Sequence, residues 1–370
     1  MPDAVILAAR RTPFATRGRR LADVPVEHLA APVLRAVVAD AAIDVPIADV
    51  TLGNCRGPGG NPARVATLAS GLDPRIPGVT IDRQCASGLA AVVSAVTGIR
   101  AGDDRVHLAG GAESASTAPL RSTADRVHDR APFAPDGFDD PDMTVAADDL
   151  AARFGISRGR QDAQAERSHR RAIAARDARR FDAEIVAIGS LRADDAIGAA
   201  LPVLSRLRPL HPGGTVTAAT ATRVSDGAAA VLVAPVGARE GRPGLLVRDT
   251  TAVGCDPALP GLGAAFAVDD LLQRQGVELG GIGAIEIVEA FAPQMLAICD
   301  HLGIVEHGPR LCADGGALAL GHPWGASGAA AVVRLFSRLI RGGAPAGTLG
   351  VAAVSAGGGI GVAMLVEVVR

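Results

Sequence analysis

One short segment of this chain occurs twice, and the repeat constrains the fold more than any other feature. Residues 86–93 read Ala-Ser-Gly-Leu-Ala-Ala-Val-Val and residues 326–333 read Ala-Ser-Gly-Ala-Ala-Ala-Val-Val, which match at seven of eight positions. Each copy opens an apolar run that closes on Arg-Ala-Gly or Arg-Gly-Gly, a pattern typical of a helix and its stop signal. The repeat predicts two related halves, unless the likeness only reflects a chain rich in Ala.

The residues that precede the two copies differ in their chemistry. Cys85 directly precedes the first, and the second follows Gly-His-Pro-Trp-Gly, which contains His322. A strand, a tight turn, a nucleophile and a helix in this order expose a side chain at a sheet edge and direct backbone N–H groups toward it. We expect the helix dipole to lower the pKa of the Cys85 thiol, and a neutral His322 to raise its thiolate fraction. The alternatives are a buried structural cysteine and a structural histidine.

A glycine-rich segment near the C-terminus is a third candidate. Residues 355–361 read Ser-Ala-Gly-Gly-Gly-Ile-Gly and lie between two expected strands. Such a run forms a turn whose N–H groups are exposed to an oxyanion or a ligand, or it is a plain hairpin.

Composition limits the partners and the mechanisms. The formal net charge of -2 favours neither nucleic acid nor an anionic membrane as a partner. The absence of Lys and Tyr excludes Schiff-base, pyridoxal-phosphate and tyrosine-acid chemistry. His, Asp and Glu residues show no metal-ligand spacing, so no metal is expected.

The cysteines and the chain's ends indicate the compartment. Five widely spaced cysteines indicate reduced thiols, and the apolar stretch 4–9 is too short for a signal peptide. The apolar region 351–369 is interrupted by glycines and Glu367, which argues against a membrane span. We therefore expect a cytoplasmic protein.

Expected strands and helices alternate along the chain, which favours a mostly parallel sheet covered by helices. The expected strands are 4–9, 50–52, 79–81, 106–109, 228–233, 245–253, 284–288, 348–355 and 361–368, and the expected helices are 27–42, 61–68, 89–99, 264–275, 293–302 and 329–340. A polar stretch with a charged helix over 158–180 interrupts this pattern, and apolar alternation resumes at 214–222.

These elements predict an α/β fold with three parts. An N-terminal half, 1–114 with 212–240, carries Cys85, and a C-terminal half, 241–370, carries His322. The inserted loop domain, 115–211, lies over one face. Ligands in such sheets bind beyond the carboxyl ends of the strands, which predicts a site at the junction of the halves.

At this point the sequence resembles the thiolase family over nearly its whole length. Six motifs carry the resemblance in order: Val-Ile-Leu-Ala-Ala-Arg-Arg-Thr-Pro at 5–13, Gly-Asn-Pro-Ala-Arg at 60–64, Gln-Cys-Ala-Ser-Gly-Leu at 84–89, Gly-Gly-Ala-Glu-Ser at 110–114, Glu-Ala-Phe-Ala at 289–292, and Gly-Gly-Ala-Leu-Ala-Leu-Gly-His-Pro at 315–323. The resemblance implies a duplicated fold in five layers, α-β-α-β-α, and an enzyme that is a homodimer or homotetramer.

The resemblance also implies roles for individual residues. Cys85 takes an acyl group from coenzyme A, His322 activates it, and the backbone N–H groups of Cys85 and Gly357 hold the thioester oxygen. Further residues fall where the family lines its channel for coenzyme A, under the insertion: Met143, Thr222, Ser225 and Phe291. No tightly bound cofactor is implied, since the coenzyme A thioester is the substrate.

Two residues depart from the family pattern. Val288 stands where the family has Asn, so the amide that holds a water beside the catalytic histidine is missing. Ser355 stands where the family has a second catalytic Cys, and an alcohol is a far weaker acid than a thiol. We expect acylation of Cys85 to persist while carbon–carbon chemistry is slowed or redirected.

The leading function is a thiolase-like acyl-CoA acyltransferase of lipid metabolism that cleaves 3-ketoacyl-CoA or runs the reverse Claisen condensation. One alternative is transfer of the acyl group to nitrogen, oxygen or water. Another is a non-catalytic member that only binds acyl-CoA or a partner chain.

Overall fold

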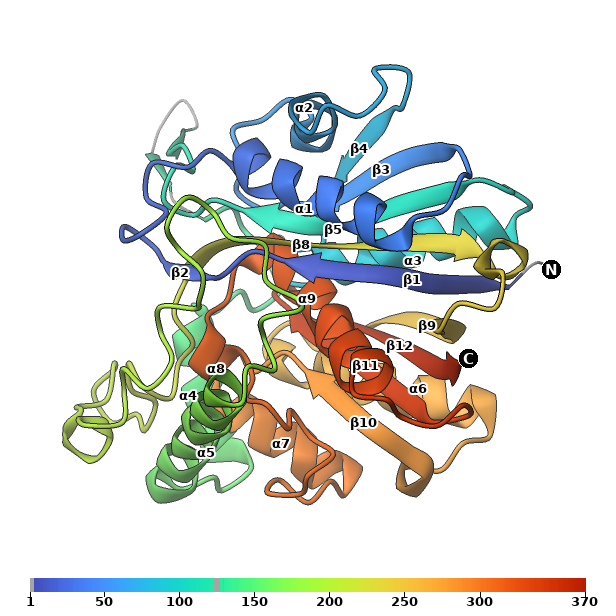
Figure 1. Ribbon diagram of the computed structural model, residues 1–370. Coiled ribbons are helices and arrows are strands. Elements are labelled where there is room, and N and C mark those ends of the chain that lie inside the picture. Colours follow the sequence, from blue (N-terminus) through green and yellow to red (C-terminus); the bar gives the residue numbers. More distant parts are fainter. Residues whose placement is uncertain (1–2, 123–126, 129) are drawn as a thin grey trace.

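The structure is a computed structural model that describes residues 3–122, 127–128 and 130–370, and a mixed sheet runs through its centre (Figure 1). The first half supplies β1 (Ala4–Arg11), β3 (Ile47–Gly53), β4 (Gly78–Ile81), β5 (Val106–Glu113) and β8 (Ser225–Pro235), with the short β2 (Ala15–Thr16) paired to β8. The second half supplies β9 (Gly244–Gly254), β10 (Ile282–Ile287), β11 (Leu349–Ala356) and β12 (Ile360–Val369). The strand order is β10-β11-β12-β9-β1-β8-β5-β3-β4.

Strand pairing repeats between the halves. β8 is antiparallel to β1 and β5, and β12 is likewise antiparallel to β9 and β11. β3 lies parallel to β5 and β4, whereas β10 lies parallel to β11 and to a single bridge at Leu311, which takes the place of β4. β1 and β9 join the halves through two residue pairs. This shared topology confirms the predicted duplication.

Helices form three layers around the two half-sheets. The bounds are α1 (Val26–Ala41), α2 (Pro62–Ala69), α3 (Ser87–Arg100), α6 (Gly263–Gln275), α7 (Ala292–Leu302) and α9 (Trp324–Phe336). α1 and α2 cover the outer face of the first half, and α6 and α7 cover that of the second (Figure 1). α3 and α9 lie between the half-sheets, where they form the largest apolar core. The five layers and the α/β class are as expected.

The segment between the halves is mostly irregular. It contains the antiparallel pair β6 (Arg121–Ser122) and β7 (Val127–His128) and the helices α4 (Met143–Arg153) and α5 (Arg158–Asp177). The short helix α8 (Ala317–Leu320) of the second half packs against α5. Residues 214–222 have the expected apolar alternation but form no strand. Their backbone makes only isolated bridges, from Thr217 to Pro209 and from Ala221 to Phe291, and joins no sheet. The exact domain bounds stay a prediction.

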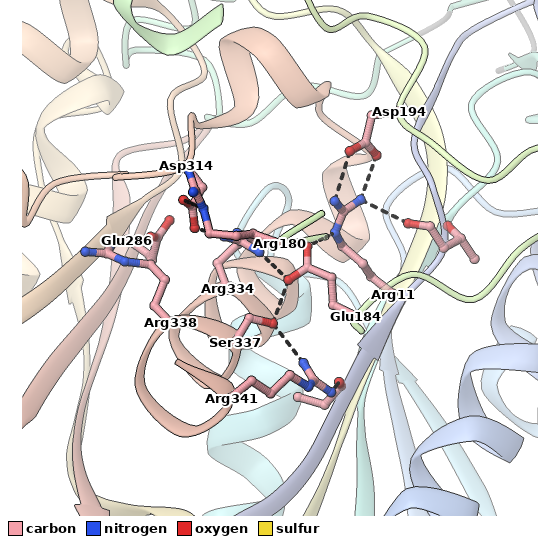
Figure 2. Close-up of polar contacts among 12 residues, drawn as sticks. Arg11, Arg180, Glu184, Asp194, Glu286, Asp314, Arg334, Ser337, Arg338 and Arg341 are labelled. Atoms are coloured by element: carbon pink, nitrogen blue, oxygen red, sulfur yellow. Dashed lines mark hydrogen bonds and ion pairs between the residues drawn. The ribbon is translucent and has the colours of Figure 1, made fainter. Parts of the chain in front are cut away.

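A buried ion cluster ties this segment to both halves (Figure 2). Arg11 of β1 donates from Nη1 and Nη2 to Asp194 at 2.6 and 2.9 Å, and from Nε to Glu184 at 2.8 Å. Arg334 of α9 binds Glu184 and Asp314. Because buried charges are stable only when paired, these contacts fix how the inserted segment sits on the core.

Among the described helices, none has the combination of length and apolar composition that crossing a bilayer requires.

Candidate active site

The turn that carries Cys85 is held by hydrogen bonds on both sides of the thiol. Gln84 takes a positive φ of 47°, a left-handed conformation that costs a residue with a side chain on the order of 1 kcal/mol. Asp82 accepts the N–H of Gln84 at 2.9 Å. Ser87 Oγ accepts the N–H of Arg83 at 2.7 Å and donates to the carbonyl of Gln84 at 2.6 Å. This sharp turn places Cys85 at the start of α3.

The pKa of the Cys85 thiol is raised, not lowered. Desolvation by burial is the largest cause and the carboxylate of Glu113 is the next, and they raise the pKa to about 12 although a backbone hydrogen bond acts in the opposite direction. The expectation of a lowered pKa from the helix dipole was therefore wrong for the resting protein. The thiol is protonated at neutral pH and needs a base before it can attack.

Glu113, at the end of β5, connects the surroundings of Cys85 with the start of α9. Its buried carboxylate accepts the backbone N–H groups of Cys55 and Arg56 at 3.1 Å and that of Gly325 at 3.0 Å. Asn54 Nδ2 approaches it at 3.3 Å. Glu113 lies in the Gly-Gly-Ala-Glu-Ser motif at 110–114, but no role was predicted for it. A carboxylate among glycines and alanines at the end of a buried strand is the signal that could have found it.

His322 lies between α8 and α9 and is anchored through its backbone. Its N–H donates to the carbonyl of Arg223 at 2.9 Å. Gly321 before it has a φ of 105°, and a Cβ there would lie 2.4 Å from Ser225 Oγ, so only glycine fits this approach. Burial lowers the pKa of His322 to about 4, which keeps the imidazole neutral at physiological pH.

Ser327 fixes the tautomer of His322. The Nδ1 of His322 lies 2.6 Å from Ser327 Oγ, and the same hydroxyl lies 3.0 Å from the carbonyl of Pro323. A carbonyl can only accept, so the hydroxyl hydrogen goes to Pro323 and the hydroxyl oxygen accepts from Nδ1–H. We therefore assign the proton to Nδ1. Nε2 is left with a free lone pair, and it is buried without a partner among the described residues.

Ser327 was not among the predicted site residues. The signal was present in the repeat, because its equivalent in the first copy is Ser87, beside Cys85. Ser87 follows Cys85 by two residues and Ser327 follows His322 by five, and both serines lie in the first turn of their helix.

The starts of α3 and α9 touch, which brings the Cys85 turn next to the His322 segment. A Cβ on Gly88 would lie 2.6 Å from the carbonyl oxygen of Gly325, and a Cβ on Gly328 would lie 2.8 Å from the backbone N of Leu89. Cys85 precedes Gly88 by three residues, and His322 precedes Gly325 by three. The two copies of the repeat thus pack against each other, and Cys85 and His322 each lie three residues before this contact.

Three residues predicted to contact coenzyme A lie beside His322. Thr222 donates from its N–H to the carbonyl of Ala290 at 2.9 Å and from Oγ1 to the carbonyl of Ala317 at 2.7 Å. Phe291 bridges to Ala221 in the same segment. Ser225 Oγ lies 3.3 Å from the N–H of His322. Thr222, Ser225 and Phe291 are thus grouped by the fold.

Met143 stands apart from this group. It is the first residue of α4, is partly buried, and follows Asp142, which caps the helix. α4 packs against α7, the helix that Phe291 caps.

Val288, Ser355 and Gly357 lie at or near the ends of β10 and β11 in the second half. Val288 is buried just beyond β10. Ser355 Oγ donates to the carbonyl of Gly261 at 2.8 Å and accepts the N–H of Ala264 at 2.9 Å, so its hydroxyl is engaged at the start of α6. A Cβ on Gly357 would lie 2.4 Å from the ring of Phe133, which therefore covers the glycine-rich turn.

The described residues contain no group of three His, Cys, Asp or Glu side chains arranged to hold a metal ion.

The chemistry that Cys85 and His322 can perform is proton transfer to a neutral imidazole and nucleophilic attack by a thiol at a helix start.

Comparisons with known proteins agree with the fold and the motifs. Residues 4–237 match the thiolase N-terminal domain family and residues 242–368 match the thiolase C-terminal domain family. The chain is 41% identical to "Putative acetyl-CoA C-acetyltransferase YhfS" of Bacillus subtilis over 99% of both chains. It is 38% identical to "Putative acetyl-CoA C-acetyltransferase VraB" of Staphylococcus haemolyticus, again over 99% of both. A crystal structure of the Bacillus anthracis acetyl-CoA acetyltransferase superposes with a TM-score of 0.90 at 31% identity, covering 100% of this chain and 99% of that one.

Proposed function

Because this chain belongs to the thiolase family, we propose that it is an acyl-CoA acyltransferase that carries the acyl group on Cys85 and cleaves 3-ketoacyl-CoA or runs the reverse condensation. The observation that carries the proposal is the buried Nε2 of His322, unpartnered in the described structure while Nδ1 is held by Ser327. A neutral imidazole with a free lone pair is the base that a protonated thiol requires.

The first half-reaction needs only groups that this chain retains. His322 Nε2 takes the proton from Cys85 as Sγ attacks the thioester carbonyl of acyl-CoA. The backbone N–H groups of Cys85 and Gly357 stabilise the developing oxyanion. When the tetrahedral intermediate collapses, the C–S bond to coenzyme A breaks and the leaving thiolate takes the proton from the imidazolium. The products are acyl-Cys85 and coenzyme A.

Mass spectrometry tests this half-reaction directly. Incubation with acetyl-CoA is expected to add one acetyl group to the peptide that contains Cys85, and Cys85→Ala is expected to add none there. A parent protein that binds acetyl-CoA without any adduct would instead favour the non-catalytic alternative.

Carbon–carbon bond formation and cleavage have weaker support. The apolar Val288 cannot hold a water, and the hydroxyl of Ser355 is engaged by Gly261 and Ala264. These observations favour the second candidate function, transfer of the acyl group from Cys85 to a nitrogen, oxygen or water acceptor. Loss of a positioned acid or base costs about 10²–10⁴-fold in rate.

The double variant Val288→Asn with Ser355→Cys separates the two candidates. We expect it to cleave acetoacetyl-CoA with free coenzyme A faster than the parent, since it regains an amide and a titratable thiol. Ser355→Ala is the control, because it removes the hydroxyl without adding an acid. A double variant no faster than the parent would show that these two positions do not limit the carbon–carbon step.

We also propose a homodimer that forms through the free edge of β4. β4 ends the sheet, and Val79 on it is 40% exposed, while Val65 and Leu68 on the adjacent α2 are each 48% exposed. Apolar side chains beside an unpaired strand edge are typical of an interface. Light scattering should give a dimer or its multiple for the parent and a smaller species for Val79→Lys.

Cytoplasmic location is a further proposal. It is supported by five cysteines that are all free, which suits a reducing compartment.

A further inference from the structure

A small cavity lies behind the His322 segment, beside the ion cluster. It has a volume of about 40 Å³, and one of its walls is formed by Ser327, Ala330, Ala331 and Arg334, which share one face of α9. The end of β10, with Glu286 and Val288, and the loop 315–321 form the other wall. A cavity needs roughly 10–15 Å³ to hold one water molecule, so this one has room for more than one.

Arg334 presents an unpaired donor in this region. Its two terminal nitrogens bind Glu184 and Asp314, whereas its buried Nε has no partner among the described residues (Figure 2). A buried charged group with an unused N–H costs free energy unless something accepts from it. Arg334 and Ser327 lie seven residues apart on the same face of α9, and both line the cavity.

The cavity also has an acceptor at its other end. Ser327 Oγ already donates to Pro323 and accepts from His322 Nδ1, and a hydroxyl oxygen has a second lone pair. Glu286, whose Oε1 binds Arg338 at 2.6 Å, adds a buried carboxylate on the opposite wall. Polar groups at both ends of a space of this size meet the requirement of two or more partners for each buried water.

We propose that ordered water in this cavity links Arg334 Nε to Ser327 Oγ, so that Arg334 acts as a positioning residue for His322. The water accepts from Nε–H and donates to Ser327 Oγ, which keeps that oxygen oriented toward Nδ1–H. The ion cluster thereby holds the imidazole in the tautomer whose Nε2 is a base. This inference rests on the proposed function of His322. The apolar side chain of Val288 also lines the cavity and cannot bind a water there, whereas Arg334 Nε–H can donate to one.

A cavity-filling variant tests the link without breaking the ion cluster. Ala331→Val puts two methyl groups into the cavity and displaces the water, whereas Ala331→Ser replaces it in part with a hydroxyl. We expect the maximal rate of Cys85 acylation by acetyl-CoA to fall about 10- to 100-fold in the valine variant, with little change in the half-saturating concentration, and to stay near the parent rate in the serine variant. Thermal unfolding should show a modest loss of stability in the valine variant, because Arg334 Nε–H loses its acceptor, and little change in the serine variant.

A double-mutant cycle distinguishes positioning from packing. If the cavity acts through Ser327, Ala331→Val has little further effect on acylation in a Ser327→Ala background. Additive effects of the two substitutions, or a valine variant that acylates as fast as the parent, would overturn the inference. Ala330→Val repeats the cycle from the neighbouring position if Ala331→Val does not fold.

The failure of this inference differs from the failure of the proposed function. A parent that forms no acyl-Cys85 contradicts the function. A parent that forms it, together with additive variants, contradicts only the role of Arg334 and the cavity.

Discussion

The two copies of the repeated segment, residues 86–93 and 326–333, begin two equivalent helices and support different chemistry. In the first copy, Ser87 bonds to the backbone of Arg83 and Gln84 and so shapes the turn that carries a thiol. In the second copy, the equivalent Ser327 bonds to the side chain of His322 and so selects its tautomer. Ser87 thus orients backbone groups, whereas Ser327 orients the imidazole ring of His322. Duplication therefore supplied the frame, and the residues just before each copy supplied the function.

The titratable group beside each copy is kept neutral by burial. Burial raises the pKa of Cys85 to about 12 and lowers that of His322 to about 4, so both groups are neutral in the resting protein. We therefore expect no thiolate in the resting protein, and we expect the proton to move as the thiol attacks.

Removal of the base should have the largest effect. His322→Gln keeps a side chain that can hydrogen-bond but has no basic nitrogen, so acylation of Cys85 should slow by about 10²–10⁴-fold. Single-turnover acylation with acetyl-CoA, followed by mass spectrometry, measures it. His301→Gln, a histidine on α7 outside the site, is the control. Acylation at the parent rate in His322→Gln would mean that another group deprotonates the thiol.

The equivalent serines should differ most in their effect on the rate. Ser327→Ala leaves the buried Nδ1–H of His322 without its acceptor, so acylation should slow about 10- to 100-fold and the free energy of unfolding should fall by about 1–3 kcal/mol. Ser87→Ala removes one hydrogen bond from the partly buried N–H of Arg83, so the free energy of unfolding should fall by about 1 kcal/mol. Urea denaturation and single-turnover acylation on both variants give the comparison. Equal losses of rate would show that the two serines have the same role.

Much of the fold could be predicted from the sequence, because the repeat and the alternation of strands and helices are local signals. The pKa of Cys85 could not, since it depends on burial and on Glu113, which comes from another strand. Nor could the engagement of Ser355, whose partners Gly261 and Ala264 lie about 90 residues earlier in the chain. The apolar alternation of residues 214–222 does not reveal that they form no strand, since Ala219 packs against α5 and residues 200–204 and the backbone makes only isolated bridges.

The contact between the copies should be sensitive to a single methyl group. A Cβ on Gly88 would lie 2.6 Å from the carbonyl oxygen of Gly325, and a Cβ on Gly328 would lie 2.8 Å from the backbone of Leu89. Gly88→Ala and Gly328→Ala should each lower the free energy of unfolding by about 1–3 kcal/mol, because backbone must move. Gly159→Ala in α5, where nothing lies within 4 Å, is the matched control and should be neutral or stabilising.

The pH dependence of stability should reveal how strongly the second copy keeps its imidazole neutral. The pKa of His322 is about 4 in the folded chain against 6.5 for an ordinary histidine. As the pH falls below 6.5, the unfolded chain binds a proton that the folded chain refuses, so stability is lost between pH 6.5 and 4. At pH 5 the loss from this residue is roughly 2 kcal/mol.

Urea denaturation at pH 7 and pH 5 on the parent and on His322→Gln measures that loss. The variant should lose less stability on acidification, and the remaining slope should come in part from His169, whose pKa burial also lowers to about 4. If His322→Gln and the parent lose the same stability, the imidazole is already protonated or solvated in the folded state. A resting site with a neutral thiol and a neutral base would then be contradicted, and a thiolate–imidazolium pair would be the better description.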